Sequence, residues 1–191
     1  MLAGGKSTRM GHDKSVISWN GKEQRYYVAD LLQQFCDDVF ISCREEQVPE
    51  IDSRYKAIAD TVDGNGPIVG ILSAFETKHD VAWLVVACDL PLIDKATIEY
   101  LICKRDTNKV ATTYKSPHDG LPEPLITIWE PKAKETLYAF KEQGYNCPRK
   151  ALINSDVLML EPLNPDTLIN TNTPEDAERV KEILTRKMKA V

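Results

Sequence analysis

Short apolar runs rich in β-branched residues alternate along the chain with longer stretches in which apolar residues recur at helical spacing. That alternation is typical of a parallel sheet whose strands are joined by crossover helices. The short runs predict strands at Asp38–Ser42, Tyr55–Ala59, Val81–Ala87, Lys109–Tyr114, Leu125–Trp129 and Val157–Leu160. The longer stretches predict helices at Gln24–Phe35, Ile68–Lys78, Lys95–Lys104, Lys132–Gln143 and Glu175–Lys189. We therefore expect a three-layer α/β fold with a mostly parallel central sheet and helices on both faces.

Three segments of the sequence predict more specific features: a buried strand, a helix start and a loop. The run Val81–Ala87 does not alternate with polar residues, which predicts a central strand covered on both faces. The last helix has Thr173 as a candidate N-cap and Pro174 at its first position, followed by acidic residues in the first turn. The segment Pro117–Pro124 is the one long break, and it fits either the rim of a substrate pocket or an ordinary surface loop.

The composition narrows the class of protein. A chain of 191 residues is long enough for one compact core, and we expect a single domain over residues 1–191. Its 42% hydrophobic and 28% charged residues exclude a disordered or collagen-like chain. The net charge is −5 and no block of Lys and Arg occurs, which argues against binding of nucleic acid through its phosphates. Any phosphate-bearing ligand must be held by a local arrangement.

The cysteines and the apolar runs bear on the compartment. The five cysteines are an odd number, and none of their spacings matches a zinc site, so they fit reduced thiols. No apolar run reaches the ~20 residues that span a bilayer, and no signal-peptide pattern is present. We expect a cytoplasmic protein without a membrane partner.

The first residues of the chain form a glycine-rich segment with basic and hydroxyl side chains. Its sequence is Met1, Leu2, Ala3, Gly4, Gly5, Lys6, Ser7, Thr8, Arg9, Met10, Gly11, His12, Asp13, Lys14. Glycine permits the backbone conformations and the close approach that let N–H groups turn toward an anion. Arg9 and Lys14 would neutralise phosphate charge. The segment fits neither the Walker pattern nor the Rossmann fingerprint, and from its physics alone a flexible N-terminal tail is an equal alternative.

The order of these residues resembles the opening motif of the MobA-like nucleotidyltransferases, the family of the molybdenum cofactor guanylyltransferases. The matching positions are Leu2, Ala3, Gly4, Gly5, Ser7, Arg9, Met10, Gly11, Asp13 and Lys14. The resemblance implies a Rossmann-like nucleotidyltransferase fold in which this loop wraps the triphosphate and base of GTP. It also implies that Lys14, with Arg9, stabilises the charge that builds up during transfer. Relatives carry an apolar strand before this motif, whereas only Met1 precedes Leu2 here. Either some leading residues are missing from the sequence, or the start was set too late, or the sheet tolerates a stub.

A carboxylate follows the predicted buried strand. Asp89 stands where ligands bind in sheets of this class, at the carboxyl end of a strand, and its oxygens suit Mg²⁺ carrying a nucleotide. The alternative is that Asp89 caps the next turn. The resemblance favours the metal ligand, because the family has an aspartate at this strand end, and it makes Asp89 part of the catalytic and nucleotide-binding set.

Further segments match the family. Asp60 follows a predicted strand and corresponds to an aspartate that binds the nucleotide, and Gly66 and Pro67 correspond to the start of a helix beside it. Asn172, with Asn170 close behind, lies in a segment that helps hold the metal in related transferases. An asparagine-rich turn before a capped helix describes the same residues, and the two interpretations are compatible.

Two more matches concern the base and the acceptor. The family often has an asparagine beside the base where Cys43 or Ser42 stands here, and Arg44 is a further candidate near the base. The segment Glu123–Leu125 corresponds to one that faces the acceptor.

Together the resemblances imply transfer of GMP from GTP to molybdopterin with Mg²⁺, releasing pyrophosphate, and transient contact with molybdoenzymes or other cofactor-synthesis proteins. The alternatives are a cytidylyl or sugar-phosphate nucleotidyltransferase and a non-catalytic nucleotide-binding module. The run Leu2, Ala3, Gly4, Gly5 together with Gly66, Pro67 resembles the guanylyl branch, whereas cytidylyl relatives more often have Leu, Ala, Ala, Gly at the first segment.

Overall fold

The computed structural model describes residues 1–5, 14–19 and 21–189, with side chains described as far as residue 186. The helices are α1 Gln24–Leu32, α2 Pro67–Thr77, α3 Lys95–Cys103, α4 Ala133–Glu142, α5 Arg149–Ile153 and α6 Pro174–Lys189. The strands are β1 Phe40–Cys43, β2 Lys56–Ala59, β3 Trp83–Val86, β4 Ala111–Lys115, β5 Pro122–Trp129 and β6 Val157–Leu160. Three 3-10 turns, η1 Lys14–Val16, η2 Glu45–Glu50 and η3 Pro165–Leu168, complete the described elements.

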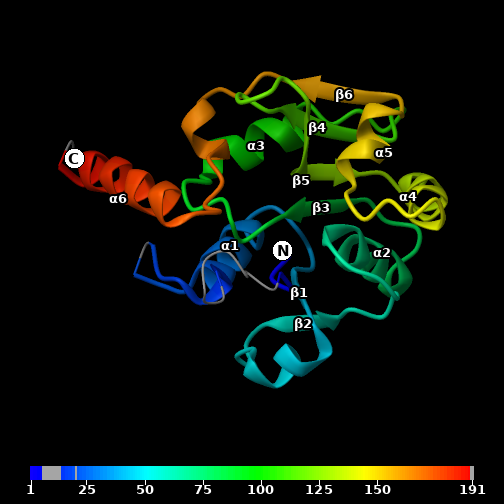
Figure 1. Ribbon diagram of the computed structural model, residues 1–191, viewed down its shortest axis with the longest axis horizontal. Coiled ribbons are helices and arrows are strands. Elements are labelled where there is room, and N and C mark those ends of the chain that lie inside the picture. The colour runs from blue at the N-terminus through cyan, green and yellow to red at the C-terminus, as the bar shows by residue number, and fades with distance from the viewer. Residues whose placement is uncertain (6–13, 20, 190–191) are drawn as a thin grey trace.

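The strands form two sheets that the amino-terminal residues join. β1 pairs with β2 in parallel, and the other sheet has the order β3-β5-β4-β6. Leu2 forms parallel bridges to both Ser42 and Ala87, so the first residues lie between β1 and β3 (Figure 1). β5 runs antiparallel to β3 and β4, while β4 and β6 are parallel. All the described strands but β5 run in the same direction, so the prediction of a mostly parallel sheet is confirmed. β3 ends the four-stranded sheet, and the amino-terminal residues lie along its other side through the bridge from Leu2.

Two apolar clusters cover the two faces of the sheet. One contains α1 and α3, and the other contains α2, α4 and α5, which Figure 1 shows on opposite sides of the strands. The adjacent residues Val85 and Val86 of β3 belong to different clusters, because successive side chains of a strand point to opposite faces. The prediction of helices on both faces is therefore confirmed.

The predicted break Pro117–Pro124 is shorter in the structure. β5 begins at Pro122, and the link from β4 is a tight loop in which Ser116 N donates to Leu121 O at 2.8 Å. A register shift between Thr113 and Lys115 lies opposite this start of β5. A bulge of this kind tolerates residues without a backbone N–H to donate, which explains how a strand with two prolines forms here. The predicted break therefore extends too far at its carboxyl end, because Pro122–Pro124 belong to β5.

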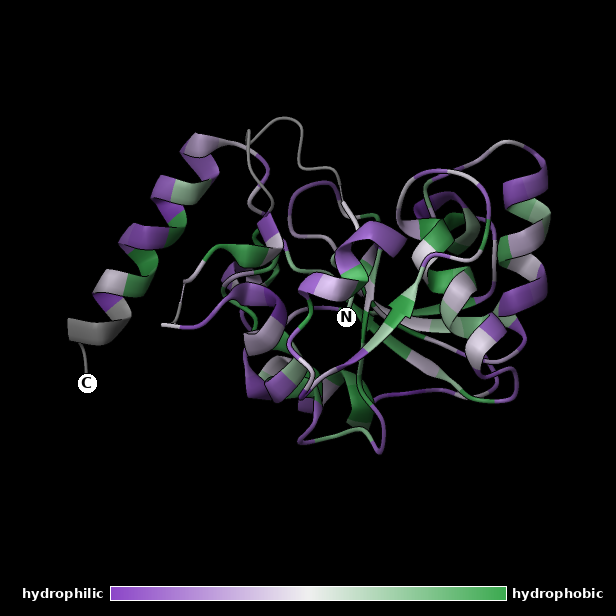
Figure 2. Ribbon diagram, turned by 90° about the horizontal axis from the view of Figure 1, so that it is seen from below, coloured by the Kyte–Doolittle hydropathy of each residue, from purple (hydrophilic) through white to green (hydrophobic). Residues whose placement is uncertain are grey.

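The cap predicted for the last helix is present. Asp176 N donates to Thr173 Oγ1 at 3.2 Å, and Asp176 Oδ2 accepts from Thr173 N and Asn172 N at 2.9 Å each. This reciprocal arrangement fixes the residues just before α6. α6 itself extends away from the rest of the molecule (Figures 1 and 2). None of the described helices is long and apolar enough to cross a membrane.

The approach of α2 to the joined strands depends on one glycine. Gly70 is buried, and a Cβ atom there would lie 2.6 Å from Ser42 Oγ and 2.9 Å from Leu2 Cδ2. We expect Gly70→Ala to lower the free energy of unfolding by about 1–3 kcal/mol, because overpacking outweighs the gain in helix propensity.

Chemical denaturation measures this difference, with Gly5→Ala as the matched control. A Cβ atom at Gly5 meets no described heavy atom within 4 Å. Equal stability of Gly70→Ala and Gly5→Ala would show that the contact of α2 with Leu2 and Ser42 is loose.

Candidate active site

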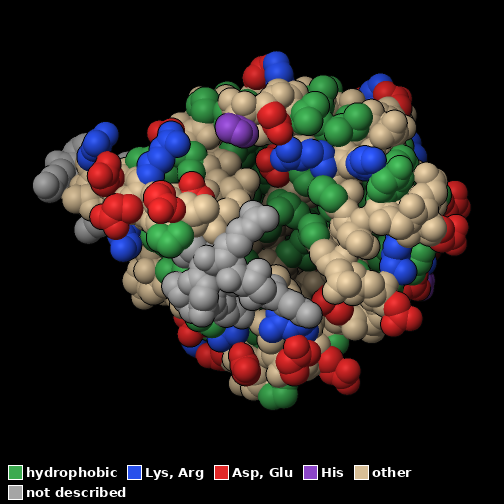
Figure 3. Space-filling view, viewed as in Figure 1, with side chains coloured by type: hydrophobic (Ala, Val, Ile, Leu, Met, Phe, Trp, Pro, Cys, Tyr) green, Lys and Arg blue, Asp and Glu red, His purple; other side chains and the backbone are tan. Residues whose placement is uncertain are grey.

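A cavity of about 440 Å³ lies at the carboxyl ends of the parallel strands. It is lined by Leu2, Gly4, Gly5, Lys14, Ser42, Arg44, Asp60, Gly64, Asn65, Gly66, Pro67, Val69, Gly70, Ala87, Cys88, Asp89 and Leu125. Figure 3 shows the molecule hollowed near the middle of this face, with apolar side chains in the floor of the hollow. We call this cavity the first cavity. Its position matches the crevice where open α/β sheets bind ligands.

Parallel pairing explains which residues meet there. β1, β2 and β3 end at Cys43, Ala59 and Val86, and their carboxyl ends lie at one edge of the sheet. The residues that follow these ends therefore surround the same space. Among the predicted residues, the structure brings together Leu2, Gly4, Gly5, Lys14, Asp60, Gly66, Pro67 and Asp89.

Ala3 and Cys43, both predicted to contact the nucleotide, do not line this cavity. Ala3 is 2% exposed and packs in the cluster that contains α1, and Cys43 is fully buried. The reason is strand alternation: Leu2 and Gly4 face the cavity on either side of Ala3, and Ser42 and Arg44 do so on either side of Cys43. Burial, with Asp60 nearby, raises the pKa of the Cys43 thiol to about 11, so it stays protonated at neutral pH.

Arg44 holds the glycine-bearing segment in place, and Asp60 lies close to it. Arg44 Nη1 donates to Gly4 O at 2.6 Å, and a Cβ atom at Gly4 would lie 3.3 Å from Asp60 Oδ2. Burial raises the pKa of the Asp60 carboxyl, and the Arg44 guanidinium opposes that rise. Arg44, which the sequence suggested near the base, is therefore both a wall of the cavity and an anchor for Gly4.

The start of α2 closes another side of the first cavity. Gly66 has φ +83°, a conformation that favours glycine, and a Cβ atom there would lie 2.9 Å from Asn146 O. Pro67 follows at the first helical position, as the sequence predicted. The N-terminus of a helix presents unpaired N–H groups and a partial positive charge, so it suits a polar or anionic ligand group.

Asp89 is a buried carboxylate with an unused oxygen. Its Oδ1 is shielded from solvent and accepts no hydrogen bond from the described residues. Burial raises the pKa of this carboxyl, and Lys14 acts in the opposite direction. Thr171 N donates to Asp89 O at 2.9 Å, and this bond sets Asn170 and Asn172 beside the end of β3. Asn170 Oδ1 is also buried without a described donor.

A second cavity of about 450 Å³ adjoins this junction. It is lined by Ser116, Pro117, His118, Asp119, Glu123, Arg149, Pro165, Asp166, Leu168, Ile169, Asn170, Asn172, Asp176 and Arg179. Lys14, a wall of the first cavity, donates through Nζ to Oδ1 of Asn172, a wall of the second, at 2.7 Å. The contact between Lys14 and Asn172 therefore marks where the two cavities meet.

The second cavity contains an ion pair that sequence reasoning missed. Arg149 Nη1 lies 2.7 Å from Asp119 Oδ2, and Arg149 Nη2 lies 3.1 Å from Glu123 Oε2. Glu123 is 3% exposed, and burial raises the pKa of its carboxyl against the effect of Arg149. Arg149 begins α5, whose five residues are too short to show a helical period, so no pattern pointed to it.

The other predicted positions are placed as follows. Glu123 lines the second cavity, Leu125 lines the first, and Pro124 lines neither. Pro117 and His118, from the predicted break, lie at the rim of the second cavity. Arg9 lies outside the described residues.

A glycine-bearing strand end, a lysine and a buried carboxylate around one cavity, on a mostly parallel sheet, are the features of a nucleotidyltransferase. A family model described as the MobA-like NTP transferase domain matches residues 1–158, and the chain belongs to that family.

Known proteins resemble the chain over most of its length. The molybdenum cofactor biosynthesis bifunctional protein of Synechocystis is 36% identical over 177 residues, which cover 92% of this chain and 51% of that protein. The chain thus spans about half the length of that relative. The molybdenum cofactor guanylyltransferase of Pseudomonas entomophila is 32% identical, covering 92% of this chain and 93% of the relative. The crystal structure of molybdopterin-guanine dinucleotide biosynthesis protein A from Archaeoglobus fulgidus has a TM-score of 0.81 and 26% identity, covering 97% of each chain.

The buried carboxyl of Asp89 predicts a pH-dependent stability. Because its pKa is raised in the folded state, the stability that its protonated form provides is present at low pH and is lost as the pH rises through the folded pKa. Asn has the same shape without the charge. We therefore expect Asp89→Asn to unfold at a higher temperature than the wild type at pH 8, with no such gain at pH values below the unfolded pKa of about 4.

Thermal unfolding across this pH range tests the expectation. Asp63→Asn is the control, because Asp63 is exposed and its substitution should change stability little at any pH. A loss of stability for Asp89→Asn that is the same at every pH would contradict the expectation, because it would mean that the carboxyl is held by hydrogen bonds.

Proposed function

We propose that this chain transfers GMP from GTP to molybdopterin with Mg²⁺ and releases pyrophosphate. The observation that carries the proposal is the meeting of two cavities at Lys14, Asn172 and Asp89. A reaction that joins two large substrates needs two adjoining pockets with the reacting groups at their boundary. Relatives named molybdenum cofactor guanylyltransferase support the choice of substrates.

The first cavity is the proposed site for GTP. Gly4, Gly5 and Gly66 let the backbone approach the ligand, and the start of α2 offers N–H groups. Apolar side chains in the lining can contact the faces of the base, while Asp60 and Arg44 can bind its polar edge. Pocket walls of this kind, largely apolar with a few polar groups, are typical of ligand sites.

The second cavity is the proposed site for molybdopterin. Arg149 has its guanidinium between two carboxylates there, and a phosphate group is a bidentate partner of the kind that guanidinium favours. His118 and Arg179 line the same space and add groups able to bind a polar acceptor. The expected contact with molybdoenzymes or other cofactor-synthesis proteins belongs to this proposal. The free cysteines fit a reducing, cytosolic location.

The residues at the boundary fit a divalent cation. Asp89 Oδ1 and Asn170 Oδ1 are buried oxygens without described donors, and oxygen is the ligand type that Mg²⁺ prefers. No group of three His, Cys, Asp or Glu side chains gathers for a metal in the part of the chain that the structure describes. Mg²⁺ in nucleotide sites commonly takes one or two carboxylates and completes its shell with phosphates and water. Asp89, Asn170 and Asn172 would hold it, and when bound it neutralises charge on the phosphates.

In the proposed reaction an oxygen of the terminal phosphate of molybdopterin forms a bond to the α-phosphorus of GTP. The bond from that phosphorus to the bridging oxygen breaks, and pyrophosphate leaves. The chain needs no covalent nucleophile, because positioning and charge neutralisation suffice. Lys14 binds the α-phosphate at the boundary of the cavities, and Asn172 holds its ammonium there before substrate arrives. Arg9 is proposed to assist with the triphosphate.

Pyrophosphate release tests the substrates. We expect the wild type to release pyrophosphate with GTP, Mg²⁺ and molybdopterin together, and far less with ATP, CTP or UTP. Omitting molybdopterin or Mg²⁺ should abolish release. Release with CTP in place of GTP would assign a cytidylyltransferase, and GTP binding without release under all conditions would assign a nucleotide-binding module.

Lys14→Ala tests the charge at the boundary. Removal of one preorganised group that binds developing charge lowers kcat by about 10²–10³-fold. We expect that loss with an unchanged unfolding midpoint, because Lys14 is not part of either apolar cluster. Lys181→Ala, on the exposed surface of α6, is the control and should keep full activity. Transfer by Lys14→Ala at the wild-type rate would remove Lys14 from the mechanism.

A further inference from the structure

Gln24, the first residue of α1, is a buried polar side chain that neither cavity uses. It is 0% exposed, and its Nε2 donates to Leu90 O at 3.0 Å. Its Oε1 is also buried and has no hydrogen-bond donor among the described residues. A buried acceptor without a donor opposes folding by about 1–3 kcal/mol, which offsets what the bond to Leu90 O contributes to stability.

The contacts of Gln24 join two segments of the site. Its backbone N donates to Ile17 O at 2.9 Å, and Ile17 N in turn donates to Lys14 O at 3.3 Å. On the other side, Leu90 directly follows Asp89. One residue therefore touches both the turn that carries Lys14 and the turn that carries Asp89.

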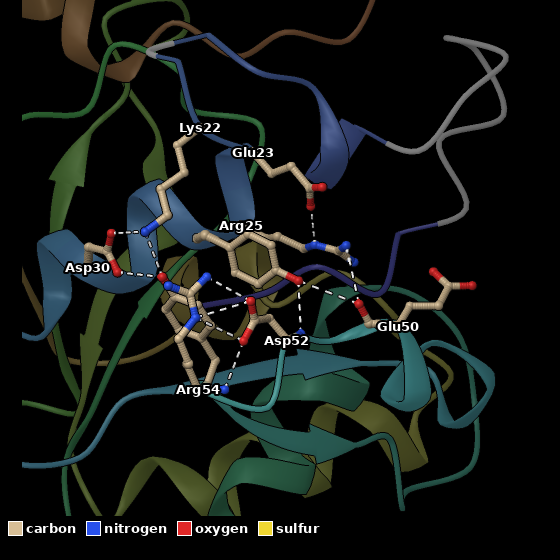
Figure 4. A network of polar contacts seen from close by, with 9 residues as sticks. Lys22, Glu23, Arg25, Asp30, Glu50, Asp52 and Arg54 are labelled. Atoms are coloured by element: carbon tan, nitrogen blue, oxygen red, sulfur yellow. Dashed lines mark hydrogen bonds and ion pairs between the residues drawn. The ribbon is translucent and has the colours of Figure 1, made fainter.

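The residues after Gln24 in the first turn of α1 bind the end of η2 and the loop after it, which fixes the backbone position of Gln24. Arg25 Nη2 and Tyr26 OH each donate to Glu50 O at 3.4 Å, and Asp52 N donates to Tyr26 OH at 3.0 Å (Figure 4). Glu50 ends η2, the segment that follows Arg44 of the first cavity. The first turn of α1 thus contacts three segments of the site: the Lys14 turn, the Asp89 turn and η2, which follows Arg44.

The Asp89 turn is held from the opposite side as well. Thr171, 1% exposed, donates to Asp89 O through N at 2.9 Å and through Oγ1 at 3.3 Å. Two successive carbonyls, those of Asp89 and Leu90, therefore accept from two different segments. With only one of them bound, the turn could rotate and carry the carboxylate of Asp89 away from Lys14.

We propose that Gln24 is a positioning residue that fixes the carboxylate of Asp89 relative to the ammonium of Lys14. The significance of that distance for catalysis rests on the proposed function. Gln24 touches no substrate, so its loss should leave the affinity for GTP intact. A displacement of about 1 Å at the reacting groups lowers the rate by as much as 10²-fold.

Gln24→Met tests the proposal, because methionine keeps the length of the side chain and removes both polar atoms. We expect an unfolding free energy close to that of the wild type, because the variant removes the unpaired Gln24 Oε1 but leaves Leu90 O without its donor. We also expect a GTP KM within about twofold and a kcat for pyrophosphate release lower by about 10–100-fold. A structural role alone predicts the reverse: lower stability with unchanged kcat. Gln34→Met is the control, because Gln34 is exposed near the end of the same helical segment.

A second measurement keeps this test independent of turnover. Thr171 N donates to Asp89 O at 2.9 Å, so hydrogen exchange of the Thr171 amide reports on the order of the Asp89 turn. We expect this amide to exchange faster in Gln24→Met than in the wild type and in Gln34→Met. Equal exchange in all three proteins overturns the positioning role. A wild type that protects this amide but releases no pyrophosphate would instead overturn the proposed function alone.

Discussion

The pairing of the first three residues between β1 and β3 is the constraint on which the rest of the site depends. Leu2 N donates to Val86 O at 2.8 Å and Ala3 N donates to Ser42 O at 2.7 Å, so one short segment joins two sheets. Its register delivers Gly4 to the edge where the neighbouring strands also end. It also requires α2 to come close, at Gly70. Met1 N donates to Phe40 O at 2.9 Å and continues this pairing.

Charge around the two cavities is balanced in pairs. Burial raises the pKa of three carboxyls, Asp60, Asp89 and Glu123, and in each case one cation opposes the rise. The cations are Arg44, Lys14 and Arg149 respectively. A polyanionic ligand would therefore compete with carboxylates for the same cations. Added positive charge from Mg²⁺ would relieve that competition. The proposed metal would therefore help to bind a polyanionic ligand as well as fit the oxygen ligands present.

The sequence predicted the layers of the fold well because each layer rests on local periodicity. Local information does not give the direction of a side chain: strand alternation turns the side chains of Ala3 and Cys43 into the core, away from the first cavity. The sequence did not predict a role for Arg149, because the five residues of α5 are too few to show the helical spacing of apolar positions. Its place beside Glu123 arises from the packing of α5 against β5, a tertiary contact that no local pattern encodes.

Loops beyond the ends of strands cannot use sheet pairing to fix their carbonyls, and this protein fixes them with donors from distant segments. Arg44 binds Gly4 O, Thr171 binds Asp89 O, and Gln24 binds Leu90 O. Each donor stands outside the motif that it holds, and two of them are buried. A motif therefore identifies the groups that surround a ligand, while their distances are set by residues that the motif does not contain. Because buried polar donors of this kind lower stability unless fully paired, their presence beside a site is better explained by geometry than by folding.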